Sequence, residues 1–169
     1  MAGSLAHNLT HGRGTPMTAE TKYPTCQDMM DLAYATWQQR PAWTYSEFID
    51  ELPPHIRCVA LLGNLNYQVE NGGFLQWCDN GYVACASDVL RALDWLGGEE
   101  AARVRAMVHD VTQAWGEYQD DRRRSGWNGN SDDVDAPDFD AFDAEYYAGL
   151  GDALLGALES RAATEGQGR

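Results

Sequence analysis

The stretch 67-YQVENGGFLQWCDN-80 decides the fold, because two adjacent glycines interrupt a run of helix-forming residues. Gly72 and Gly73 permit backbone angles that other residues resist, so we expect a sharp reversal of the chain at this point. Phe74 and Trp77 lie three positions apart and can enter the core together. The stretch therefore predicts a corner between two core helices.

The polar residues of the same stretch leave a second interpretation open. Gln76 and Asn80 lie four positions apart on another face, where their amides could bond to backbone groups at the reversal. Glu70 lies in the last turn of a helix, where an acid opposes the helix dipole and needs a donor, solvent or a function. A buried corner is the favoured interpretation, and a small-molecule site or an enzyme built on Glu70, Gln76 and Asn80 is the minority one.

Apolar residues recur at helical spacing along most of the chain. They predict helices over 26–39, 45–51, 54–70, 83–96 and 99–115, with a short helix or turn over 74–80. Residues 116–139 are rich in Gly, Asn, Ser and Asp and predict a long irregular acidic loop before a last helix, which Asp140 can cap. No segment alternates as a strand does. We expect an all-α, single-domain compact bundle of about five to seven helices.

Length and composition bound the rest of the organisation. A chain of 169 residues suits one domain, which we place over 25–161 between flexible tails at 1–24 and 162–169. Its polar start resembles no signal peptide, Met17 could be the native start, and no apolar run could span a membrane, so a cytoplasmic location is expected. The four cysteines form no CxxC pair, and His55 with Cys58 lacks further ligands. We predict buried free thiols, no metal and no cofactor.

The net charge of −14 is unevenly distributed. The last 39 residues carry ten acidic and two basic groups. Such a field repels nucleic acid and membranes and attracts basic surfaces. Direct nucleic-acid binding is therefore excluded as a main activity.

The corner motif carries a resemblance to a known family. Its pattern consists of Glu70, Asn71, Gly72, Gly73, Phe74, Gln76, Trp77 and Asn80. This pattern resembles the bacterial DNA-mimic protein domain, as do the helix 53-PPHIRCVALLGNLNYQV-69, the amphipathic helix after the motif and the segment 142-FDAEYYAGLGDALLGAL-158. Together they cover roughly residues 26–160, and Cys78 departs from the pattern where a second large aromatic is expected. The resemblance implies an acidic helical protein that imitates duplex charge and occupies the DNA-binding face of a regulator.

Glycines and aromatic residues do not imitate phosphates, so the motif indicates the fold and the mimicry must come from acids elsewhere. The candidates for partner binding are Asp132, Asp133, Asp135, Asp138, Asp140, Asp143, Glu145 and Asp152, with the loop residue Trp127 as a hydrophobic anchor. Asp152 and Glu159 follow Glu145 at seven-residue steps, about 10.5 Å each, whereas a duplex carries one charge per about 1.7 Å of axis. One helix is too dilute to imitate DNA. Acids of other helices would have to contribute (Asp88, Asp94, Asp110, Asp120 and Asp121), and a homodimer would extend the stripe.

Three functions remain from this sequence. The first is a non-enzymatic protein that mimics DNA charge and blocks the DNA-binding surface of a basic protein, such as a regulator, a nucleoid protein or a defence nuclease complex. The second is an immunity or antitoxin protein that plugs a specific toxin, with Trp127 and the Arg122–Arg124 cluster as contacts, although these arginines could instead fold back on the acidic segment. The third is the small-molecule binder or enzyme described above. We favour the first.

Overall fold

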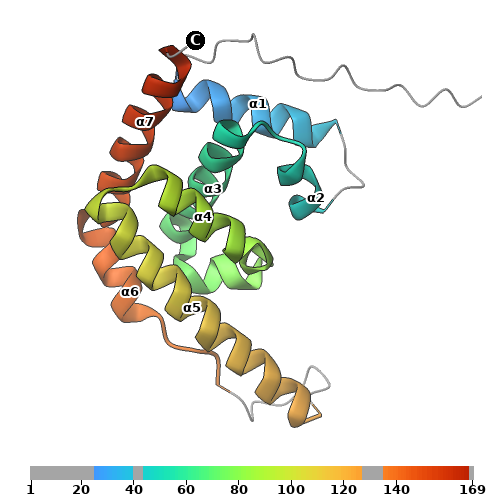
Figure 1. Cartoon of the computed structure of the whole chain (residues 1–169). Helices are drawn as coiled ribbons and strands as arrows, with labels where there is room; N and C mark the ends of the chain where they lie inside the picture. The colour runs from blue at the N-terminus through green and yellow to red at the C-terminus, as the bar shows by residue number, and fades with distance from the viewer. Residues whose placement is uncertain (1–24, 40–43, 127–134, 168–169) are drawn as a thin grey trace, which may run out of the picture.

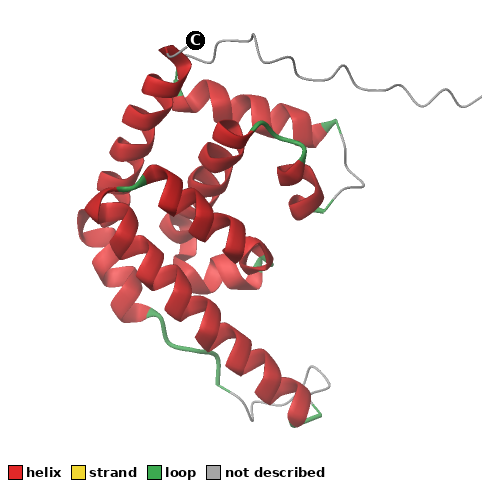
Figure 2. Ribbon diagram, viewed as in Figure 1, coloured by secondary structure: helices red, strands yellow, loops and turns green. Residues whose placement is uncertain are grey.

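The computed structural model describes residues 25–39, 44–126 and 135–167, and all regular structure in these ranges is helical (Figures 1 and 2). The elements are α1 (Cys26–Gln38), α2 (Tyr45–Asp50), α3 (Pro54–Asp79), the 3-10 turn η1 (Tyr82–Cys85), α4 (Ala86–Leu96), α5 (Gly98–Arg124), α6 (Asp140–Glu145), the π-helical turn η2 (Tyr146–Leu150) and α7 (Gly151–Gln167). The predicted all-α fold is confirmed.

Capping boxes start the first two helices. The Asp28 N–H donates to Thr25 Oγ1 at 3.0 Å, and the Thr25 N–H donates back to Asp28 Oδ2 at 3.1 Å. Thr44 and Glu47 repeat this exchange at the start of α2. Each box satisfies two of the backbone donors that a helix start leaves without partners. Thr25 therefore caps the first helix.

Helix α3 forms the centre of the core. Val59, Leu62, Leu65 and Val69 are fully buried, because α1, α4 and α7 all pack against this helix. Figure 1 shows α3 running through the middle of the bundle, with α1 crossing near its start. Apolar residues around most of the α3 surface predict this central position, which the structure confirms.

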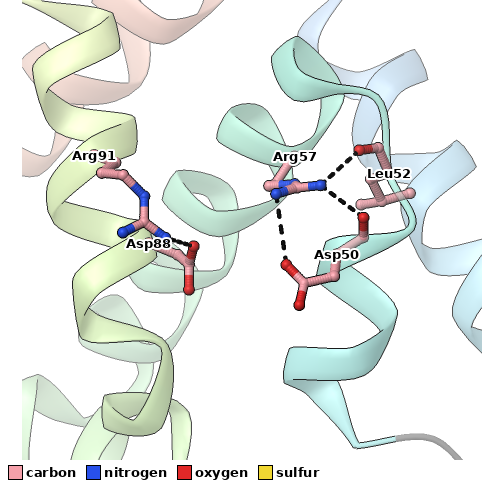
Figure 3. Close-up of polar contacts among 5 residues, drawn as sticks. All are labelled: Asp50, Leu52, Arg57, Asp88 and Arg91. Atoms are coloured by element: carbon pink, nitrogen blue, oxygen red, sulfur yellow. Dashed lines mark hydrogen bonds and ion pairs between the residues drawn. The ribbon is translucent and has the colours of Figure 1, made fainter.

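Arg57 ties the short helix α2 to α3 (Figure 3). Its Nη2 donates to the carbonyl oxygens of Asp50 at 2.6 Å and Leu52 at 3.3 Å, and its Nη1 lies 3.5 Å from the Asp50 carboxylate. The carbonyls at the end of a helix lack intrahelical partners. One guanidinium on α3 therefore supplies the donors that the end of α2 requires.

Helix α5 is longer than the sequence indicates. The predicted irregular stretch begins at residue 116, yet the helix continues to Arg124, and its last turns extend past the rest of the bundle in Figure 1. Arg123 pairs with Asp120 and Arg124 with Asp121, each three residues earlier on the same helix. These pairs stabilise a helical surface and orient the two arginines toward their own helix. Within the described residues, these two arginines therefore pair with acids of their own helix, and residues 127–134 of the acidic segment lie outside the described ranges.

The C-terminal helices also begin differently from the prediction. Phe139, rather than Asp140, occupies the cap position of α6, and Asp138 Oδ1 accepts from the Asp140 N–H at 2.9 Å. The π-helical turn η2 follows, with Gly149 at a φ of 115°, and α7 then runs to Gln167. The acid that serves the start of α6 is therefore two residues earlier than predicted.

Candidate functional site

The glycine pair places a kink inside one helix. Gly73 has a φ of 73° and a ψ of −177°, a combination that essentially only glycine adopts, whereas Gly72 is extended with a φ of −177°. The helix resumes at once and continues to Asp79. The predicted helix stop at Asn71–Gly73 is thus corrected to an interruption, because the broken backbone bonds find partners immediately.

Those partners come from the C-terminal segment. The Phe74 N–H donates to Asp143 Oδ1 at 2.8 Å, across 69 residues of chain. The Tyr147 hydroxyl donates to the Val69 carbonyl at 2.5 Å and lies beside the Gly73 N–H. In an unbroken helix Gly73 would donate to Val69 directly. The tyrosine hydroxyl is therefore inserted into the backbone bond that the kink opens.

Aromatic packing joins the same two segments. Phe74 is fully buried, and its ring meets those of Tyr146 and Phe142 edge to face at centroid distances of 5.8 Å and 6.4 Å. The Tyr146 hydroxyl donates to Asn66 Oδ1 at 2.8 Å. Trp77 is also buried, as its spacing from Phe74 predicts. The motif and the terminal helix segment, both of which carry the family resemblance, thus form one packed unit.

The two amides of the motif bond to a side chain and not to the backbone. Gln76 Nε2 and Asn80 Nδ2 both donate to the buried Gln68 Oε1, at 3.1 Å and 2.8 Å. The predicted backbone bonds are therefore wrong. Glu70 is exposed, and a Cβ added at Gly151 would lie 2.9 Å from its Oε1. No hydrogen bond among the described residues joins Glu70 to the two amides, so the structure does not bring the minority site together.

The carboxyl group of Asp143 has a raised pKa. Partial burial raises the pKa of its carboxyl, and the nearby Asp140 and Asp138 raise it further, while the Phe74 N–H opposes the shift. A Cβ at Gly73 would lie only 2.1 Å from Asp143 Oδ2. The carboxyl is therefore held against the kink, where it completes the fold.

The remaining candidate acids occupy different environments. Trp127, Asp132 and Asp133 lie outside the described residues. Glu145 is exposed and pairs with Arg103 of α5, with 2.5 Å between Oε1 and Nη2. Four others are exposed and form no ion pair within the described ranges: Asp135, Asp138, Asp140 and Asp152.

Most arginines of the described residues form ion pairs with carboxylates. Seven of them form ion pairs: Arg57, Arg91, Arg103, Arg105, Arg123, Arg124 and Arg161. Three of the pairs cross between helices: Arg57 to Asp50, Arg103 to Glu145 and Arg105 to Asp94. Because acids outnumber bases 26 to 12 in the chain, the acids that remain set the sign of the surface.

Metal sites, cysteines and membrane-spanning helices are the other functional features to consider in the described part of the chain. It contains no group of three or more His, Cys, Asp or Glu side chains that could hold a metal ion. Cys26, Cys78 and Cys85 are buried free thiols and Cys58 is half-buried, and burial raises the pKa of Cys78 to about 12. No helix within the described ranges is long and apolar enough to cross a membrane.

Sequence reasoning missed the residues that serve the kink. In the sequence, Tyr146 has the spacing of an apolar helix face, and no local pattern distinguishes Tyr147 or Gln68. The available signal was the break itself, since a buried interruption of a helix requires a donor and an acceptor from elsewhere. That requirement indicates the kinds of partner needed without indicating their positions.

Comparisons with known proteins address the expected family. No curated protein and no solved structure matches this chain. The family model of the DMP19-like proteins matches residues 50–162, which include the kink motif, α4, α5 and the C-terminal segment that packs on the kink. This match covers most of the chain and confirms the expected DNA-mimic family, although it begins later than the resemblance, at the end of α2. The chain belongs to the DMP19-like protein family.

Proposed function

We propose that this protein is a non-enzymatic inhibitor that presents surface carboxylates to the DNA-binding face of a basic protein. The observation that carries the proposal is the commitment of seven arginines to ion pairs in a chain whose net charge is −14. Membership of the DMP19-like family supports the same conclusion. Cations already paired on the surface leave the remaining acids to act together on a partner.

The proposed contact surface lies along α6 and the start of α7. Asp135, Asp138, Asp140 and Asp152 are exposed there, and we assign Asp132 and Asp133 to the same surface from their place in the sequence. The Arg103–Glu145 pair joins α5 to α6 and the Arg105–Asp94 pair joins α5 to α4, which supports a contribution from the acids of α4 and α5. Several helices together supply the charge density that one helix lacks.

The test begins with capture of a partner at low salt by the immobilised protein, followed by identification of the captured protein. The partner is then titrated into a labelled DNA duplex with and without this chain. Mimicry predicts that the chain releases the duplex, and that both capture and release weaken steeply as salt rises. A partner that is held equally at low and high salt, and that still binds DNA, would sink the proposal.

Charge reversal separates mimicry from a shape-driven plug of the immunity type. The variant with Asp135→Lys and Asp152→Lys changes two exposed acids of the proposed surface, and the control with Glu51→Lys and Asp79→Lys makes the same change in net charge elsewhere. Mimicry predicts that the first variant loses competition with DNA while the control largely retains it. Retention of most partner binding by both variants would favour the plug.

A further inference from the structure

A groove lies between α1 and α3. Its volume is about 490 Å³, and residues of α2 and α7 complete it. The apolar part of the lining consists of Met30, Ala33, Trp37, Phe48, Ala60 and Leu155. This size and composition are typical of sites that bind an apolar group.

Two matched pairs of residues form the rim of the groove. Asp31 and Tyr34 lie three apart on α1, and Tyr67 and Glu70 lie three apart on α3, so each acid shares a helix face with its tyrosine. Tyr34 is 62% exposed and Tyr67 is 63% exposed, which is unusual for large aromatic side chains. Each rim therefore presents an open ring beside a carboxylate.

The charge of the lining is of one sign. Asp31 and Glu70 are its acids, and no lysine or arginine is among the described residues that line the groove. An aromatic face attracts a cation, and a carboxylate beside it adds to the attraction. An apolar floor suits an aliphatic side chain or the stem of a long cationic one. The groove thus complements a group that is apolar in the middle and positive at its edges.

We propose that this groove binds a basic amphipathic segment of the partner protein. Apolar side chains of the segment enter between α1 and α3, and its arginines or lysines lie over Tyr34 and Tyr67 beside Asp31 and Glu70. Helix α1 precedes the region that matches the family model, so this contact would add partner selectivity to the acidic surface. The inference rests on the proposed function in one respect, the basic nature of the partner.

The test uses peptides and the full-length chain labelled with nitrogen-15. The probe is an acetylated 14-residue peptide with leucines at helical spacing and arginines between them. Two matched peptides replace all arginines with glutamate or all leucines with serine. We expect the Leu/Arg peptide to shift the amide resonances of groove residues on α1 and α3, and both matched peptides to bind far more weakly.

Variants locate the contact. Tyr34→Ala with Tyr67→Ala should weaken binding of the Leu/Arg peptide by about tenfold, since two cation–ring contacts are lost. Asp31→Asn with Glu70→Gln should also weaken it, whereas Glu51→Gln with Asp79→Asn, a charge-matched control outside the groove lining, should not. The rings and the acids are exposed, so the far-ultraviolet circular dichroism of each variant should match that of the parent.

Several outcomes would overturn the groove assignment. Shifts confined to α5 and α6, unchanged in the tyrosine variant, would do so and leave the proposed function intact. Equal binding of the glutamate peptide, or no binding of any peptide, would also do so. Groove shifts that depend on protein concentration without peptide would place a second copy of the chain there instead. Groove binding by the Leu/Arg peptide alongside a partner that does not compete with DNA would instead uphold the groove and contradict the proposed function.

Discussion

The hydroxyl of Tyr147 stands where α3 lacks a backbone hydrogen bond, and the carboxylate of Asp143 receives the next free N–H. A buried polar group without a partner destabilises a fold by about 1–3 kcal/mol. Two side chains on neighbouring turns thus make a helix interruption tolerable inside the core. At the residue scale, the motif fixes the backbone geometry of the kink, and its polar groups serve hydrogen bonds within the fold.

Replacement of Gly73 by alanine tests that constraint. The backbone conformation at Gly73 disfavours any side chain. The new Cβ would lie 2.1 Å from Asp143 Oδ2, so the carboxylate would have to move. We expect Gly73→Ala to lower the free energy of unfolding by roughly 3–4 kcal/mol, as strain and a lost hydrogen bond combine. Gly81→Ala is the control, since Gly81 has a φ of 81° but none of the described atoms lies within 4 Å of an added Cβ, and it should lose about 1–2 kcal/mol. Urea unfolding measures both, and equal losses would contradict the role of Asp143.

Asp143 also makes a prediction about pH. Its folded-state pKa is raised, so the folded chain holds this proton more tightly than the unfolded chain. The stability that Asp143 contributes is therefore full below its unfolded pKa and is lost as pH rises through the folded value. Asp143→Asn keeps an acceptor for the Phe74 N–H and removes the titration. We expect the variant to gain stability relative to the parent between pH 3 and pH 7, and a relative loss over that range would refute the assignment.

The glycine break could be predicted from sequence, since Gly72 and Gly73 have few other uses next to a buried apolar helix. The identity of the groups that serve it could not, because Asp143 lies 69 residues away and resembles the acids around it. An aspartate that caps a kink and one that faces solvent have the same local sequence signature. Only the packing of the terminal helix on α3 distinguishes them.

At the scale of the elements, apolar periodicity located α1, α2 and the first part of α3 to within about two residues, because their caps are encoded next to them. It failed for α5. Gly116 and a run of acids and arginines resemble a loop, yet the pairs from Arg123 to Asp120 and from Arg124 to Asp121 are spaced for a helix. Opposite charges at three-residue spacing therefore indicate a helix even where the composition resembles that of a loop.

The contacts of Arg57 with the end of α2 offer a test at the same scale. Arg57→Ala removes two hydrogen bonds to carbonyls at the end of α2 and one ion pair, so we expect it to lose roughly 1–3 kcal/mol of unfolding free energy. Amide hydrogen exchange should become faster in α2 before it does in α3.

Arg91→Ala is the matched control, because the one ion pair that Arg91 forms with a described residue is to Asp88, three positions earlier on the same helix (Figure 3). It should lose about 0.5 kcal/mol or less. If the two alanine variants were equally stable, the contacts of Arg57 with α2 would have no energetic role.

For the whole molecule, charge repulsion opposes compaction. Exposed ion pairs contribute at most about 1 kcal/mol each, and many contribute nothing measurable, so screening them weakens the fold little. Screening the repulsion among acids in a chain of net charge −14 should have the larger effect.

We therefore expect the midpoint of thermal unfolding to rise by about 2–4 °C between low and physiological sodium chloride, as for a gain near 1 kcal/mol in a domain of this size. The rise should shrink in the variant with Asp135→Asn and Asp152→Asn, which carries two fewer negative charges. A fall in the midpoint with salt would show that the ion pairs outweigh the repulsion.

The contacts across the kink also bear on how the chain is made. Phe74 is separated from Asp143 by 69 residues, Val69 from Tyr147 by 78 and Asn66 from Tyr146 by 80. A ribosome releases the central helix long before it synthesises the residues that complete it. During that interval the opened backbone groups can be satisfied only by water, so the middle of α3 must stay hydrated and unsealed. The nascent protein therefore closes its core last at the glycines, when the C-terminal tyrosines arrive.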